Sequence, residues 1–409
     1  MKTLTGPFSQ ILTLEDLPLN GAIDDRRLQV IAGAGVITDQ GLILETGNFE
    51  ELYARNPGIQ VEETAGENVL LPGFIDCHTH ICFAGNRAKD YSMRIQGKSY
   101  LEIARNGGGI WDSVIQTRAA DETALTALLQ QRAERHLNEG VTTIEVKSGY
   151  GLDVANELKQ LRAIRKVSES SVAELVPTCL AAHLLPKDFP GTAADYLNHV
   201  LKDLLPLVKA EDLAKRMDIF IEESAFSSIE ALPYLRAAKA MGFQLTVHAD
   251  QFSTGGLHIA VETGALSADH LEAVTEKEIN LLKGSSTVAV VLPGASLGLG
   301  LPYAPARKLL DAGACVAIAS DWNPGSAPMG DLLMQASVMS AAEKLGTAEV
   351  FAGLTFRAAQ ALGMNDRGML IRGMKADMQA YPCNDYREIL YHQGKLKPHM
   401  VWKNGVRRL

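Results

Sequence analysis

The sequence has few cysteines, and they do not form the spacing of a redox or metal-binding pair. Its 409 residues contain five, with no C-x-x-C motif: Cys77, Cys82, Cys179, Cys315 and Cys383. Secreted domains that depend on disulfides carry an even number of cysteines, so a disulfide framework is not expected. We therefore expect a reducing compartment and interpret the five thiols as small buried side chains.

Long apolar segments are also missing. The most apolar stretch, residues 287–301, is interrupted by Pro293 and several glycines, and it is shorter than the roughly 18 residues that span a bilayer. The first residues, MKTLTGP, lack the uninterrupted apolar region of a secretion signal. We expect a cytoplasmic protein that does not bind membranes.

A third absence is an excess of basic residues. The sequence has 39 Lys and Arg against 48 Asp and Glu, which gives a net charge of -9 at pH 7. A net acidic surface repels phosphate backbones and anionic lipids, so nucleic acid is not an expected partner. The 46% of hydrophobic residues is typical of a folded globular protein rather than a disordered chain.

The central part of the chain alternates short apolar runs with long amphipathic segments. Eight runs are predicted strands, at residues 69–75, 142–146, 173–181, 218–221, 243–247, 265–268, 288–292 and 314–319. Eight β-then-α units predict parallel pairing and a closed TIM (β/α)8 barrel. An open doubly wound sheet is the alternative, but it normally has a glycine-rich loop after its first strand, and none follows Ile75.

The two ends of the chain differ from the centre. Residues 1–65 contain short β-like runs separated by turn signals, and residues 373–409 have a similar pattern. We expect both ends to form one small β-sandwich-like domain, and residues 66–372 to form the barrel.

Side chains that could bind a metal follow several predicted strands. They are His78 and His80 after the first strand, His183 after the third, His248 after the fifth, His270 after the sixth and Asp321 after the eighth. Active sites of TIM barrels lie at the carboxyl ends of the strands, so we expect these side chains on one rim. The spacing of His78 and His80 points both rings to one side of an extended chain.

The expected ligand types indicate both a metal and a chemistry. Imidazole and carboxylate together suit Zn²⁺ or Fe²⁺ better than Ca²⁺ or Mg²⁺. A metal ion with an open position lowers the pKa of its water from about 16 to about 7, which makes a nucleophile at neutral pH. Asp321 can contact both metal and water, so it is our candidate for carrying the proton to a leaving nitrogen.

Several segments resemble a known family. Residues 71–80, LPGFIDCHTH, resemble the first-strand signature of the amidohydrolase superfamily. Other segments resemble the imidazolonepropionase family within it: RIQGKSY (94–100), GGGI (107–110), KSGYGL (147–152), HADQ (248–251), ADHLE (268–272) and DWNPGS (321–326). The resemblance covers residues from about 70 to 330 and consists of several motifs in order.

The resemblance implies hydrolysis of the cyclic amide 4-imidazolone-5-propanoate to N-formimidoyl-L-glutamate, in histidine degradation. It implies one zinc or iron ion (Fe²⁺ or Fe³⁺) per chain, with the ligands His78, His80, His248 and Asp321. It implies a catalytic role for His270, and substrate contacts from Arg87, Tyr150, His183, Gln251, Asn323, Gly325 and Ser326. On physical grounds we expect Asp321 to carry the proton, and the metal with His270 or His183 to stabilise the developing oxyanion. The family also suggests a homodimer.

Arg87 has a clear physical reason to contact such a substrate, because a guanidinium binds a carboxylate through two parallel hydrogen bonds. A charge on a surface loop is the alternative interpretation of Arg87, and an ordinary turn residue is that of Tyr150 and Asn323. Two alternative functions stay open: a deaminase of purines or pyrimidines, and a non-catalytic metal-binding barrel.

One feature concerns the number of metal ions. Some members of the superfamily bridge two metals through a carboxylated lysine at the end of strand four. Here strand four ends in Ile221, Glu222 and Glu223, without lysine. Lys147 ends strand two instead, and we interpret it as a structural or pocket residue. A single ion is therefore expected.

Overall fold

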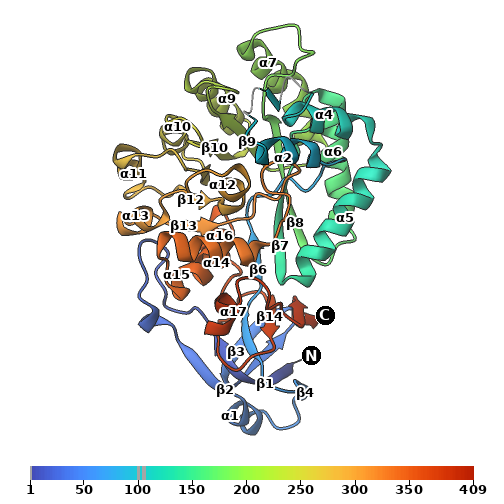
Figure 1. Ribbon diagram of the computed structural model, residues 1–409. Coiled ribbons are helices and arrows are strands. Elements are labelled where there is room, and N and C mark those ends of the chain that lie inside the picture. Colours follow the sequence, from blue (N-terminus) through green and yellow to red (C-terminus); the bar gives the residue numbers. More distant parts are fainter. Residues whose placement is uncertain (1, 99–101, 104–106) are drawn as a thin grey trace.

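The computed structural model describes residues 2–98, 102–103 and 107–409, and it contains a barrel and a separate sheet (Figure 1). Neighbouring strands of the barrel sheet run parallel. In chain order they are β6 (Phe74–Asp76), β7 (Val141–Lys147), β8 (Glu174–Ala182), β9 (Arg216–Ile221), β10 (Gln244–Ala249), β11 (Ser267–His270), β12 (Val288–Val291) and β13 (Val316–Ile318).

The barrel closes between its first and last strands. Just beyond β6 and β13, the backbone N–H of Asp321 donates to His78 O at 3.0 Å. The N–H of His80 donates to Trp322 O at 2.9 Å. The predicted TIM barrel is confirmed, and each of its eight strands overlaps a predicted run.

Helices cover the outside of the barrel (Figure 1). Helix α5 shows why they form: Asp121 accepts a hydrogen bond from Ala124 N as N-cap, and Leu125, Leu129 and Ala133 recur every four residues on its buried face. The helices are α2 (Ala88–Ile95), α4 (Ile110–Ala119), α5 (Glu122–Asn138), α6 (Val154–Ser168), α7 (Ala193–His199), α8 (Leu205–Ala210), α9 (Ser228–Ala240), α10 (Gly256–Thr263), α11 (Glu276–Leu282), α12 (Pro293–Leu299), α13 (Ala306–Asp311), α14 (Leu332–Glu343), α15 (Thr347–Leu354) and α16 (Phe356–Ala361). No helix of the described residues is long and apolar enough to cross a membrane.

Both chain ends contribute to the second sheet, at the bottom of Figure 1. Its core includes Phe8 and Trp402, whose rings meet edge to face with centroids 6.1 Å apart. Its strands are β1 (Thr3–Leu12), β2 (Val30–Asp39), β3 (Leu42–Asn48), β4 (Gln60–Glu63), β5 (Val69–Pro72), β14 (Met378–Tyr381), β15 (Met400–Lys403) and β16 (Val406–Arg407), accompanied by α1 (Phe49–Arg55) and α17 (Arg387–Tyr391). The domain boundaries predicted at 65/66 and 372/373 stay a prediction.

The predicted first strand, residues 69–75, is in fact two strands. β5 belongs to the terminal sheet, where it pairs with β1 and β14, whereas β6 opens the barrel. Gly73 lies between them, and a Cβ there would be only 2.4 Å from Thr142 Oγ1. The close approach at this glycine lets the chain pass directly from one sheet into the other.

An ion-pair cluster joins the two sheets at the amino-terminal end of β8. Glu174 Oε2 lies 2.8 Å from Arg367 Nη1, 3.1 Å from Lys375 Nζ and 3.5 Å from Lys403 Nζ. Burial alone would raise the pKa of Glu174, but these cations outweigh it and lower the pKa to about 2. Glu174 is therefore a charged link between the barrel and the terminal sheet.

Candidate active site

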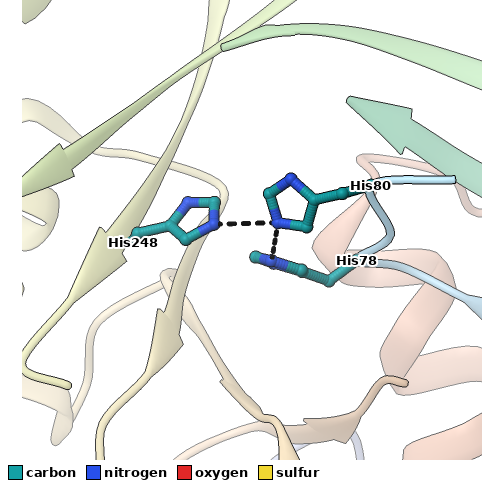
Figure 2. Close-up of side chains that lie close together, drawn as sticks. All are labelled: His78, His80 and His248. Atoms are coloured by element: carbon teal, nitrogen blue, oxygen red, sulfur yellow. Dashed lines mark hydrogen bonds between the residues drawn. The ribbon is translucent and has the colours of Figure 1, made fainter. Parts of the chain in front are cut away.

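Three histidine rings converge inside the mouth of the barrel (Figure 2). His78 and His80 follow β6, and His248 lies in β10. The Nε2 atom of His80 lies 3.2 Å from that of His78 and 3.3 Å from that of His248. Two ligands bound about 2.1 Å from a tetrahedral ion lie about 3.4 Å apart, so this spacing fits the coordination of one ion.

Two of the rings are oriented by buried carboxylates. His78 Nδ1 lies 2.6 Å from Asp269 Oδ2, and His248 Nδ1 lies 2.8 Å from Asp218 Oδ2. A carboxylate at Nδ1 keeps the proton there and leaves the Nε2 lone pair free for a metal. Burial lowers the pKa of His78, and it lowers that of His248 to about 3. Both rings are therefore neutral at pH 7, as metal ligands must be.

The third ring, His80, is held by packing. It stacks on His183, with centroids 5.5 Å apart and planes 20° apart. Burial lowers the pKa of His80 as well. Its Nδ1 is buried and has no hydrogen-bond partner among the described residues.

Asp321 approaches the same point from the other side of the barrel seam. Its Oδ1 lies 3.3 Å from His80 Nε2 and 3.6 Å from His78 Nε2. Three imidazoles and one carboxylate are a ligand set suited to zinc or iron. The three histidines lie close enough together to share one ion, and Asp321 lies beside two of them.

Lys147, which the sequence indicates only as a structural or pocket residue, lies among three carboxylates next to the histidines. Lys147 Nζ lies 2.8 Å from Glu145 Oε1, 2.9 Å from Asp218 Oδ2 and 3.9 Å from Asp269 Oδ2, and all four residues are fully buried. Burial alone would lower the pKa of Lys147, but the three carboxylates outweigh it and raise the pKa. The signal was present, because Glu145 and Lys147 are charged residues at alternate positions of an apolar strand.

Two more histidines lie beside the three. The ring of His270 is 5.4 Å from that of His248, and its Nδ1 is 3.4 Å from Glu272 Oε2. Burial would lower the pKa of His270, but Glu272 outweighs it and raises the pKa. In contrast, His183 Nδ1 lies 2.9 Å from the carbonyl oxygen of Gly149, and burial lowers the pKa of His183. The neutral His183 ring therefore donates from Nδ1 and can accept at Nε2.

The rim residues His270 and Asp321 also share an unusual backbone. Their φ angles are 91° and 48°, in the left-handed region that L-residues adopt rarely. Such conformations cost about 1–3 kcal/mol each and cluster at functional sites.

Arg87 is not a surface charge, because only 8% of it is exposed. Its Nε donates to Asp90 Oδ2 at 2.7 Å, and the same oxygen accepts from Gly109 N at 2.8 Å. Among the described residues, neither Nη group of Arg87 has a hydrogen-bond partner. A Cβ on Gly325 would lie 2.2 Å from Arg87 Nη1, so the guanidinium packs against the loop that begins at Asp321.

That loop is braced by its own side chains. Asn323 Oδ1 accepts from Gly325 N at 2.7 Å and from Ser326 N at 2.8 Å, while its Nδ2 donates to Asp321 O at 2.7 Å. Ser326 Oγ donates to Asp321 Oδ2 at 3.5 Å. These bonds fix the loop directly beside the ligand group.

Two further residues were predicted to contact the substrate, Tyr150 and Gln251. The buried ring of Tyr150 is 6.1 Å from His80 and 5.5 Å from His183. Gln251 is buried three residues after His248. Of the motif at 94–100, Ser99 and Tyr100 lie outside the described residues.

Comparison with solved structures shows which proteins share this fold. A mutant atrazine chlorohydrolase from Arthrobacter aurescens, complexed with zinc and atraton, superposes with a TM-score of 0.71 at 16% identity, covering 99% of this chain and 94% of that one. An adenosine deaminase from Xanthomonas campestris with bound zinc gives 0.70 at 15% identity, covering 100% and 92%. At this identity the likeness concerns the fold alone.

Sequence comparison is more specific. The Amidohydrolase family model matches residues 69–407. An imidazolonepropionase from Myxococcus xanthus is 41% identical, covering 97% of this chain and 94% of its own length. One from Deinococcus deserti is 40% identical over 99% of both chains. The family model and these relatives show that the chain belongs to the imidazolonepropionases of the amidohydrolase family.

Proposed function

We propose that this chain is a metal-dependent hydrolase that opens 4-imidazolone-5-propanoate to N-formimidoyl-L-glutamate in histidine degradation. Its relatives at about two-fifths identity over nearly the whole length are imidazolonepropionases. The observation that carries the proposal in the structure is the buried guanidinium of Arg87, packed against the loop of Asp321. This guanidinium could bind a carboxylate next to the candidate metal-binding site.

The metal ligands in this proposal are His78, His80, His248 and Asp321. A bound divalent ion lowers the pKa of a water molecule and polarises a carbonyl group. Asp321 accepts the proton that the water loses on attacking the ring carbonyl, and delivers it to the departing ring nitrogen. Its Oδ1 lies within 3.3–3.6 Å of two proposed ligand nitrogens, and this proximity supports the role.

The two rim histidines take different parts in the proposal. Glu272 favours the protonated form of His270, whose ring can then donate a hydrogen bond to the developing oxyanion. Neutral His183 donates a hydrogen bond from its Nδ1–H to Gly149 O. Its Nε2 is therefore suited to accept a hydrogen bond from an N–H of the substrate ring.

We propose that the Nη groups of Arg87 bind the propionate of the substrate in a bidentate manner. The other substrate contacts in the proposal are Tyr150, Gln251, Asn323, Gly325 and Ser326. A substrate of purine or pyrimidine deaminases has no propionate and would leave the two Nη groups of this guanidinium without a carboxylate to bind.

The proposal also includes one zinc or iron ion per chain and a cytoplasmic homodimer without nucleic acid or membrane partners. Support for a zinc-like ion comes from the three-histidine group and from zinc in neighbours of the same fold. The net charge of -9 supports the absence of nucleic acid as a partner.

The test is metal analysis of the purified protein, combined with an ultraviolet assay for loss of the imidazolone ring. We expect about one ion per chain, turnover that stops after chelation, and recovery when zinc or iron returns. Purines and pyrimidines serve as alternative substrates. Turnover of these compounds without turnover of the imidazolone would refute the proposal. Chelation that lowers only the melting temperature of a protein without turnover would favour a metal-binding barrel.

A further inference from the structure

Three buried carboxylates contact the segments that carry the histidines: Asp218, Asp269 and Glu145. Asp218 contacts His248 twice: its Oδ2 lies 2.8 Å from Nδ1, and its Oδ1 accepts from the backbone N–H at 3.2 Å. Asp269 contacts the Nδ1 of His78. The two segments that carry the histidines, residues 78–80 and the end of β10, come from distant parts of the chain, so something must keep these carboxylates in register.

The third carboxylate belongs to Glu145. Its Oε2 accepts from the backbone N–H of Thr79 at 3.2 Å, and Thr79 is the residue between His78 and His80. Glu145 therefore fixes the backbone that sets the spacing of the two rings. Its other oxygen, Oε1, accepts from Lys147 Nζ.

One ammonium group faces all three carboxylates. Lys147 Nζ is the cation within 4 Å of Glu145, Asp218 and Asp269 in the described part of the chain. We propose that Lys147 is a positioning residue, which ties the segments of His78, His80 and His248 into one metal-binding unit through these carboxylates. The inference rests on the metal site of the proposed function, but not on the identity of the substrate.

A purely structural role is the competing explanation, because a buried ammonium between carboxylates also supports the barrel wherever it lies. Lys403 provides a matched control. It is 4% exposed, its Nζ lies 2.7 Å from Asp377 Oδ2 and 3.5 Å from Glu174 Oε2, and it belongs to the terminal sheet. Removing Lys403 removes a comparable ion pair without touching the histidines.

The experiment compares Lys147→Met, Lys403→Met and the unchanged protein. The dissociation constant for Co²⁺ is measured by competition with a chelator, and the visible spectrum of the Co²⁺ form reports the coordination geometry. Loss of a partner that orients a metal ligand typically weakens binding by about 10–100-fold. We expect a loss of this size and a shifted spectrum for Lys147→Met, with Lys403→Met unchanged within about threefold.

Lys147→Gln, which keeps a hydrogen-bond donor inside the barrel, is the milder variant if Lys147→Met does not fold. Any folded variant without the ammonium that binds Co²⁺ with unchanged affinity and spectrum overturns the inference. So does a failure of both variants to fold that added Co²⁺ does not rescue, since the lysine would then support the barrel alone. Both readouts need no substrate, so a wrong substrate in the proposed function would leave them unaffected.

Discussion

Replacing Arg87 by methionine should weaken substrate binding far more than it slows the chemical step. Its Nε is occupied by Asp90, so the two Nη groups are the ones that can bind a carboxylate. A hydrogen bond to a charged group contributes roughly 1.5–3 kcal/mol, so two contribute about 3–6 kcal/mol. At 1.4 kcal/mol per factor of ten, kcat/KM should fall by roughly 10²–10⁴, mostly through KM.

The assay pairs this variant with a substrate in which a carboxamide replaces the carboxylate. The unchanged protein should prefer the acid over the amide by a large factor, whereas Arg87→Met should process both about equally. Lys89→Met, which removes an exposed charge from α2 two residues beyond Arg87, is the control and should stay within about threefold. If Arg87→Met still prefers the acid as strongly as the unchanged protein does, Arg87 does not bind the propionate. Melting temperature and metal content are measured in parallel, because Asp90 loses one of its two donors.

Three further predictions follow from other contacts. Asp321→Asn should lower kcat by roughly 10²–10⁴, the usual contribution of a proton carrier, and near-normal turnover with metal bound would exclude Asp321 from that role. Gly325→Ala should raise KM with little change in melting temperature, because its Cβ would lie 2.2 Å from Arg87 Nη1; an unchanged KM would contradict the packing. Glu174→Gln tests the ion-pair cluster: the pKa of Glu174 lies near 2 instead of 4.5, so its stabilising charge is present above pH 4.5 and is lost as the pH falls towards 2. The difference in unfolding free energy between the two proteins should shrink over that range, and a difference that stays constant from pH 5 to pH 2 would argue against the link.

Much of the barrel and the metal group was predictable because strands impose simple rules. An extended chain repeats every two residues, which brought His78 and His80 to the same side. Parallel strands end on one rim, which brought His248 and Asp321 to them across some 170 and 240 residues of chain. Both rules require only the positions of the polar residues relative to the predicted strands.

The predictions were incomplete where the deciding contact was distant in sequence. Gly73 lies between two strands and approaches Thr142, on a third strand, too closely for a Cβ, and an apolar run cannot reveal such a neighbour. The buried carboxylates Asp218 and Asp269 were also missed as partners of the histidines. Only the folded register shows that Asp218 faces His248, or that Asp269 reaches His78.

The seam of the barrel runs through the ligand group. His78 and Asp321 join the first and last strands through their backbones, and the same two residues contribute side chains to the candidate metal site. An ion held there would link the two segments that close the cylinder between β6 and β13. Ion binding and closure of the barrel would then be coupled. A protein without its ion should therefore open first at the contacts between the segments of His78 and Asp321.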